Sequence, residues 1–287
     1  MRFGSLMINM CKYSQMKYIF FFICLLGLYS CEREISFDYP TSETKVIFDG
    51  IISNEGVSVR ISRTRPIGDK QKGQPVSTAQ VWIVSDDGEE EQLVYDEQKG
   101  CYTSVTGLVG IPGHEYQMKA VLDGHHYEAT SLMQDAVVVD TAYFRSVKIL
   151  QDRLYFYCVK GVMPTQDKRV YHLCKLLRGD EVFRWNPWSG RGIIDGRIEY
   201  DIICSSESDM DKGIDDEGLI PLMEGDTIRM ELLTIDRACW DYYQSLVASE
   251  LMTANPLTNI KGGAEGIFMA AGIARPDTIV FRKKDAY

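Results

Sequence analysis

Apolar and polar residues alternate along much of the chain that follows residue 43. The segment EYQMKAVL at 115–122 shows the two-residue period of a strand that buries one face. Similar segments follow one another at the spacing of a β-sandwich, with the hairpin-turn dipeptides Asp87-Gly88 and Asp123-Gly124 between them. No helical period interrupts this stretch. The pattern therefore predicts an N-terminal immunoglobulin-like β-sandwich at residues 44–134.

Residues 135–287 are predicted to form a second β-rich domain that contains one helix. Strand-like segments continue through this part of the chain, but apolar residues recur at helical spacing from Arg237 to about Met252. Asp236 is suited to the N-cap of that helix, and Asn255-Pro256 marks its end. The expected fold class is therefore mainly β.

The N-terminus carries a short apolar run, Tyr18–Tyr29, preceded by Lys17. A transmembrane helix needs about 20 apolar residues, so this run is typical of a secretory signal instead. Its end, Leu28-Tyr29-Ser30-Cys31, resembles a bacterial lipobox. We therefore predict a lipoprotein signal peptide at 1–30, lipid attachment at Cys31 and a tether at 31–43. Translation from Met1 or from Met16 is compatible with this interpretation.

A lipid on Cys31 would hold the protein to a membrane without a spanning segment. Lipidation contributes about 0.8 kcal/mol for each buried CH₂ group, and several acyl chains make a stable anchor. The formal net charge of −10 argues against a nucleic-acid partner and against electrostatic adhesion to anionic lipids. The membrane contact that we expect is therefore the lipid anchor itself.

The cysteines and acidic residues do not predict a metal or cofactor site. Five cysteines follow Cys31, and none forms the C-x-x-C spacing of a zinc site. We interpret them as buried small apolar residues, with a disulfide between Cys158 and Cys174 as the alternative. The acidic segment 207–218 lacks the glycine and the final glutamate of a calcium loop, and it is predicted to be a solvated loop. The five cysteines are Cys101, Cys158, Cys174, Cys204 and Cys239.

The segment RWNPWSGRG at 184–192 contains the candidate binding residues. Arg184, Trp185, Trp188 and Arg191 stand in what the neighbouring proline and glycines predict to be a loop. Tryptophan and arginine are enriched at the centres of protein interfaces. Contact with a protein partner, contact with a ligand such as a sugar, and packing over a sheet edge all remain open for this segment.

Catalytic motifs of the common nucleophile, zinc-protease and nucleotide-binding types do not occur in the sequence. The sequence therefore shows no motif that would pair a nucleophile with a base, which disfavours an anchored hydrolase. We therefore predict that the protein is not an enzyme and that it works by binding.

The C-terminal part contains a Gly-Asp-x-Ile strand start, a helix with an Asp-Tyr-Tyr core, an Asn-Pro segment and then N-I-x-G-G-x-x-G-x-F. This series resembles a family of Bacteroidota outer-membrane lipoproteins called domain of unknown function 4249. Ala264 and the MAAGIA stretch depart from the aromatic and serine residues that are frequent in the family. The matching positions are Gly225, Asp226, Asp241, Tyr242, Tyr243, Asn255, Pro256, Asn259, Ile260, Gly262, Gly263, Gly266 and Phe268.

The resemblance implies an outer-membrane lipoprotein, on either face of that membrane, of a family often encoded near TonB-dependent transporters. It implies no catalytic residue. We expect a lipid-anchored accessory or binding protein that partners a TonB-dependent transporter in nutrient uptake, with a small-molecule ligand of undefined class. The alternative is a surface adhesin or structural envelope lipoprotein without a transporter partner.

Overall fold

The fold was analysed in a computed structural model that describes residues 44–64, 73–164, 170–190, 196–215, 218–251 and 255–286. Residues 43–287 form one compact unit. The fold is mainly β, as the sequence predicted, with a large sheet, a second sheet of three strands and two α-helices among the described residues. No helix in this part of the chain is long and apolar enough to span a membrane.

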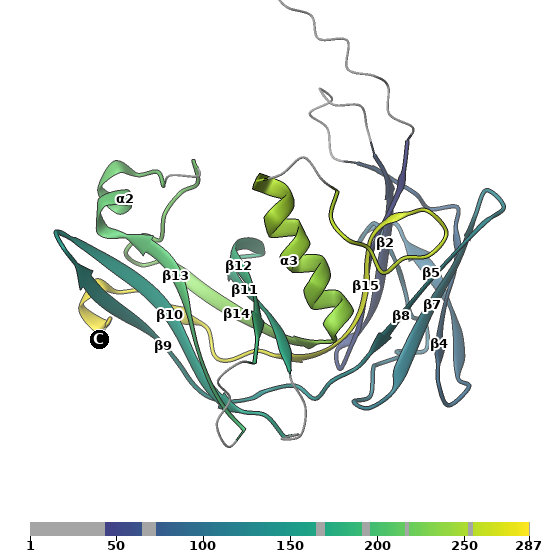
Figure 1. The fold of residues 1–287 in the computed structure, drawn as a ribbon, viewed down its shortest axis with the longest axis horizontal. Helices are drawn as coiled ribbons and strands as arrows, with labels where there is room; N and C mark the ends of the chain where they lie inside the picture. The colour runs from purple at the N-terminus through teal and green to yellow at the C-terminus, as the bar shows by residue number, and fades with distance from the viewer. Residues whose placement is uncertain are drawn as a thin grey trace, which may run out of the picture. The chain divides into compact units, whose positions relative to one another are not determined.

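The N-terminal half contains the strands β1 to β8 (Figure 1). Their order in the sheet is β1-β2-β6-β5-β4-β7-β8, with β3 paired to β2. The bounds are β1 Val46–Ser53, β2 Gly56–Arg63, β3 Gln74–Pro75, β4 Gln80–Ser85, β5 Glu90–Asp96, β6 Cys101–Thr103, β7 Glu115–Leu122 and β8 His125–Leu132.

Alternation along these strands builds the core of the N-terminal half. On β7, Tyr116, Met118 and Ala120 are buried, while the residues between them are more exposed. The predicted turn at Asp123-Gly124 joins β7 to β8, with positive φ angles at both residues. That turn type is favoured in two-residue hairpins because its twist matches the twist of the strands. The strand and hairpin predictions for this half are therefore confirmed.

The C-terminal half contains the strands β9 to β16 and the helices. The bounds are β9 Val138–Ile149, β10 Asp152–Val162, β11 Tyr171–Arg178, β12 Glu181–Ser189, β13 Arg197–Ser206, α2 Glu207–Lys212, β14 Thr227–Ile235, α3 Arg237–Leu251, β15 Glu265–Ala274, β16 Ile279–Val280 and the 3₁₀ turn η1 Lys283–Asp285.

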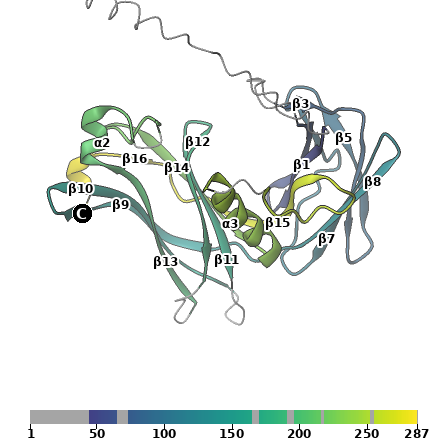
Figure 2. The same cartoon turned by 45° about the horizontal axis from the view of Figure 1, so that its top comes forward.

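Two layers of strands enclose the core of the C-terminal half. The separate sheet β13-β10-β9 packs against β12-β11-β14 of the large sheet (Figure 2). Side chains from both layers meet there, including Tyr157 from β10, Leu176 from β11 and Met230 from β14. Helix α3 lies on the opposite face of β11 and β15, where Cys239 is fully buried (Figure 1).

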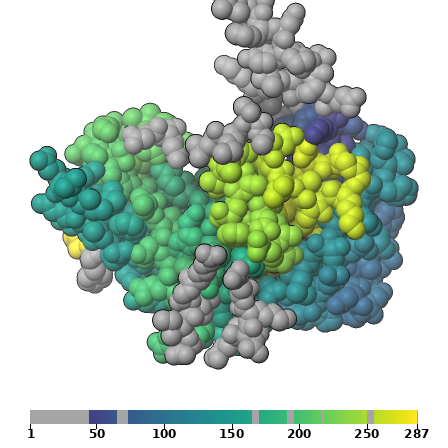
Figure 3. Space-filling view, in the orientation of Figure 1, coloured from purple at the N-terminus to yellow at the C-terminus, as the bar shows by residue number. Residues whose placement is uncertain are grey.

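Strand β15 joins the two halves. It pairs in parallel with β1 and antiparallel with β14, so the large sheet is continuous between them. Ile260, Ala264 and Phe268, which come late in the chain, are buried in the core of the N-terminal half. In Figure 3 the yellow surface of this segment adjoins the blue surface of the N-terminal strands. The domain division at residue 134 stays a prediction. The structure adds that β15 contributes to the core of the N-terminal half.

The predicted helix is confirmed as α3, Arg237–Leu251. Asp236 caps it by accepting a 2.9 Å hydrogen bond from the backbone N–H of Cys239. The structure adds the short helix α2, so the acidic segment 207–218 is not simply the solvated loop that we expected. Ser206 caps α2 by accepting from the backbone N–H of Asp209, and Gly213 ends it at a φ of 74°.

The five described cysteines are all buried and unpaired, which confirms their interpretation as small apolar residues. The alternative disulfide between Cys158 and Cys174 is not formed. Within the described ranges, no three His, Cys, Asp or Glu side chains gather into a group that could hold a metal ion.

Candidate binding groove

The segment with the predicted binding residues is a strand rather than the expected loop. Arg184, Trp185 and Trp188 lie on β12, which pairs with β11 through residues 181–189. Proline lacks a backbone N–H and is tolerated in sheets mainly at edges. Pro187 stands on such an edge, so its presence did not exclude a strand. Arg191 and the predicted lipidation site Cys31 lie outside the described residues.

The two tryptophans point to opposite faces of β12, because they are three residues apart on a strand. The ring of Trp188 lies 4.0 Å from the ring of Tyr200 on β13 and packs against the core between the two layers. The ring of Trp185 lies 5.7 Å from the ring of Tyr243 on α3. The structure therefore does not bring the two indoles together, and Trp188 has the environment of a packing residue.

Arg184 and Trp185 instead line one side of a groove between β12 and β13, with a volume of about 640 Å³. We call it the β12–β13 groove. The other side is formed by residues 203–206 of β13, and Asp209, Asp215, Leu219 and Val247 also contribute. Within the described chain, β12 pairs only with β11, and β13 pairs only with β10. Each strand therefore has one edge without a paired neighbour among the described residues.

Four large apolar side chains of the groove are exposed. Val182 is 51% exposed, Ile203 55%, Leu219 47% and Val247 41%. They come from β12, β13, the segment after α2, and α3, four elements that are distant in the sequence. Large apolar side chains that converge in this way mark interaction sites more often than scattered ones do.

An ion pair between Arg184 and Asp215 fixes one end of the groove. The two side chains are only 18% and 9% exposed, and the guanidinium group also lies 4.6 Å from the centre of the Phe183 ring. Asp215 in turn accepts a 2.8 Å hydrogen bond from the backbone N–H of Leu219. The pair therefore connects β12 to the turn that carries Leu219.

Burial keeps two nearby titratable groups of the C-terminal half uncharged at neutral pH. Burial raises the pKa of the Cys204 thiol to about 12. Burial also lowers the pKa of His172, which lies on β11 opposite Trp188 and beside Tyr200 and does not line the groove, to about 3. The groove thus combines exposed apolar side chains with charged groups that are paired within the protein, Arg184 with Asp215 and Asp209 with Lys212. Such a surface is suited to holding an apolar polypeptide segment.

Sequence reasoning missed the four exposed apolar residues of the groove. For Ile203 a signal was present, because Ile202 and Cys204 on either side are buried and alternation directs Ile203 outward. No comparable signal exists for Val247, because its exposure depends on how α3 meets β12. The assembly of these residues is a property of the tertiary structure.

The motif residues of the C-terminal part have structural roles. The side-chain amide of Asn259 donates to the backbone carbonyl of Phe268 at 2.7 Å, and its oxygen accepts from the Phe268 N–H at 3.0 Å. Gly266 has a φ of 97°, and a Cβ there would lie 1.9 Å from the Phe48 carbonyl oxygen. Asp226 pairs with Arg178 at 3.0 Å. These contacts hold β15 beside β1 and order the start of β14, and they assign no site.

Comparison with known proteins agrees with the motif. No curated protein matches the chain. The model of the family described as "Domain of unknown function (DUF4249)" matches residues 32–275, which is most of the sequence. The chain therefore belongs to the DUF4249 family.

Proposed function

We propose that this protein is a lipid-anchored outer-membrane accessory protein that works by binding and that partners a TonB-dependent transporter in nutrient uptake. The β12–β13 groove receives an extended, apolar segment of the partner. The observation that carries the proposal is the pair of strand edges, unpaired among the described residues, at one groove that also exposes Val182, Ile203, Leu219 and Val247.

The backbone explains why an extended segment fits this groove. An unpaired strand edge offers a row of N–H and C=O groups that can accept one more strand. Side chains of an added strand alternate between two faces, so every second side chain could contact the exposed apolar residues of the groove. Cys31, the predicted lipid site, would keep the protein in the same membrane as the transporter.

Co-purification tests the proposal. The full-length protein is extracted from native membranes in mild detergent, as the wild type and as Val182→Asp and Ile203→Asp. A charge in the groove disfavours apolar contact, so each variant should retain about tenfold less transporter, equivalent to roughly 1.4 kcal/mol. Val105→Asp is the matched control, because Val105 is 73% exposed and lies outside the groove.

The outcomes separate the two functional classes. Retention of a TonB-dependent transporter by the wild type and the control, with loss in both groove variants, supports the proposal. Absence of any transporter from the wild type contradicts it and favours an adhesin or structural lipoprotein. Cys31→Ala should abolish incorporation of labelled fatty acid, and unchanged labelling would refute the anchor.

A further inference from the structure

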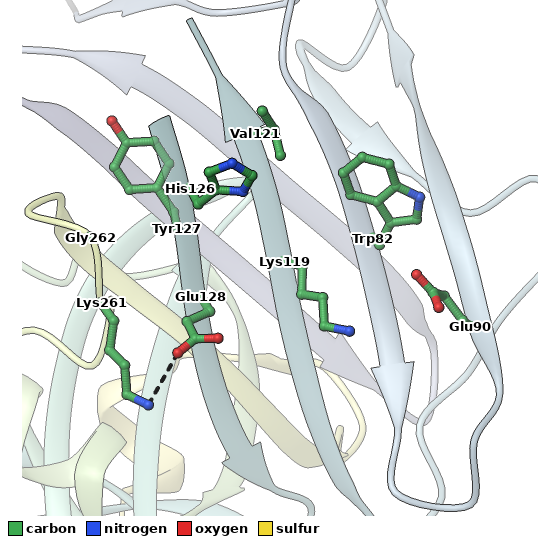
Figure 4. A pocket seen from close by; sticks show the side chains of 9 residues that line it. All are labelled: Trp82, Glu90, Lys119, Val121, His126, Tyr127, Glu128, Lys261 and Gly262. Atoms are coloured by element: carbon green, nitrogen blue, oxygen red, sulfur yellow. Dashed lines mark hydrogen bonds and ion pairs between the residues drawn. The ribbon is translucent and has the colours of Figure 1, made fainter. Parts of the chain in front are cut away.

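A second pocket lies on the outer face of the N-terminal half, far along the chain from β12. Its volume is about 510 Å³, within the range of about 300–1,000 Å³ that is common for ligand sites. Trp82 on β4, Lys119 on β7, and His126 and Glu128 on β8 line it, and Lys261 closes one side (Figure 4). We call it the Trp82 pocket.

Strand alternation explains why an indole stands on this face. Val81 and Ile83 are buried in the core, so Trp82 between them is directed to the outer face and is partly exposed. Its neighbours across the sheet are polar: Trp82 lies opposite Gln92 on one side and Lys119 on the other. A large aromatic ring among polar side chains gives the pocket one apolar surface with hydrogen-bonding groups around it.

The charges of the pocket balance one another. Lys261 pairs with Glu128 at 3.3 Å, and Gln117 donates to the same carboxylate at 3.3 Å. Of the other two charged residues, Lys119 is basic and Glu90 is acidic, and neither has an ion-pair partner among the described residues. The pocket is therefore locally neutral on a protein whose net charge is −10. That balance favours a neutral polar ligand over a strongly charged one.

The wall of the pocket is formed before any ligand binds. The backbone of Lys261 exchanges two hydrogen bonds with that of Glu128, at 2.7 and 3.3 Å, along the edge of β8. Gly262 follows with a φ of 102°, and a Cβ there would lie 2.3 Å from the His126 carbonyl oxygen. Only glycine permits this close approach. Lys261 is therefore already held beside the pocket, and ligand binding spends no free energy on ordering it.

From this arrangement we propose that the Trp82 pocket binds a neutral saccharide unit. The C–H groups on the face of a pyranose ring carry slight positive charge and pack on the negative face of an indole. Lys119 donates hydrogen bonds to sugar oxygens, and the carboxylate of Glu90 accepts from hydroxyl groups. The site needs neither the transporter nor the lipid anchor, so it stands apart from the function proposed above.

Calorimetric titration tests this site in the full-length protein, purified in detergent. The ligands are neutral hexasaccharides of glucose, galactose, mannose and xylose in α and β linkage, with oligogalacturonate as the acidic arm and an oligoglutamate peptide as the non-sugar arm. At least one neutral hexasaccharide should bind, and more tightly than either acidic ligand. Trp82→Ala should weaken that binding about tenfold or more, and Trp82→Phe should weaken it less, since a smaller ring face remains.

Charge-neutralising variants complete the test. Lys119→Gln and Glu90→Gln should each weaken binding severalfold, whereas Lys99→Gln, at a surface lysine near Asp96 outside the pocket, should leave it unchanged. The proposal is overturned if no neutral hexasaccharide binds at millimolar concentration, or if Trp82→Ala and Trp82→Phe bind as the wild type does. Tighter binding of either acidic ligand would overturn the neutral class. A thermal melt of each variant confirms that it is folded.

Discussion

The β12–β13 groove and the Trp82 pocket use β-structure in opposite ways. The groove lies at two strand edges that lack a neighbour among the described residues, and its exposed side chains are apolar. The pocket lies on the face of β4 and β7, which are paired on both sides, and it extends to β8 at the edge of the sheet, where Lys261 bridges to Glu128. The groove can therefore offer a backbone template, whereas the pocket offers mainly aromatic and polar side chains.

This difference indicates which kind of ligand each region suits. A strand edge recognises another backbone, with apolar contacts adding affinity. A paired sheet face recognises a small molecule through a few placed groups. In the account proposed here, one sheet system that is continuous through β15 would carry both a polypeptide site and a small-molecule site.

The largest expected effect is at β15, which supports both regions. Gly266→Ala places a Cβ 1.9 Å from the Phe48 carbonyl oxygen at a φ of 97°. We expect a loss of at least about 3 kcal/mol in the free energy of unfolding, measured by denaturant titration. Gly263→Ala is the matched control, because Gly263 also has a positive φ but nothing lies within 4 Å of its Cβ position. It should cost only about 1 kcal/mol, and equal costs would contradict the assigned role of Gly266.

A second expected effect separates the two halves of the chain by their response to acid. His172, buried in the C-terminal half beside Tyr200, has its pKa lowered from 6.5 to about 3 by burial. The unfolded chain therefore binds more protons than the folded chain between these values. The free energy of unfolding is therefore highest above the pKa of His172 in the unfolded chain. It falls as the pH drops below that value, by up to about 1.4 kcal/mol per pH unit.

The free energy of unfolding, measured by denaturant titration between about pH 7 and pH 4, checks this effect. His172→Gln should flatten the curve in that window, even if it lowers stability at pH 7. Glu91 of the N-terminal half provides the contrast. Burial alone would raise its pKa, but hydrogen bonds from Thr106 and its neighbours lower it below 4.5. The stability that Glu91 contributes is therefore lost only at lower pH, and Glu91→Gln should lower the upper part of the curve without changing its slope.

A smaller effect distinguishes the tryptophans of the two regions. Trp188→Ala removes a ring that packs 4.0 Å from Tyr200 and against the core, and it should cost about 2 kcal/mol. Trp82→Ala removes a ring from the outer face and should cost less than about 1 kcal/mol. Thermal melts of both variants provide the comparison. A larger loss for Trp82 would mean that its indole is needed for packing.

The sequence predicted local features better than assembled ones. Alternation predicted β7, the Asp-Gly dipeptide predicted the turn at 123–124, and Asp236 before the apolar helical period predicted the N-cap. Each of these features depends only on neighbouring residues. The strand at 181–189 was missed, because Pro187 and nearby glycines outweighed a weak strand pattern, and only pairing with β11 shows that Pro187 lies on an edge.

The sites show the same limit. Arg184 and Trp185 were predicted as binding residues and do line a groove, while Trp188 faces the core instead. Asp215 belongs to the groove through its pair with Arg184, a contact between residues 31 positions apart. Such partners follow from how strands and turns meet, and local periodicity does not encode them.

The central claim is that the β12–β13 groove holds a segment of a partner protein. Site-specific photo-crosslinking in the native membrane tests it most directly, with the photoreactive residue placed at Ile203, at Val182, or at Val105 as the control. The account predicts a crosslinked product with a TonB-dependent transporter from Ile203 and Val182 and none from Val105. Absence of that product at both groove positions, or equal product from Val105, would contradict the account.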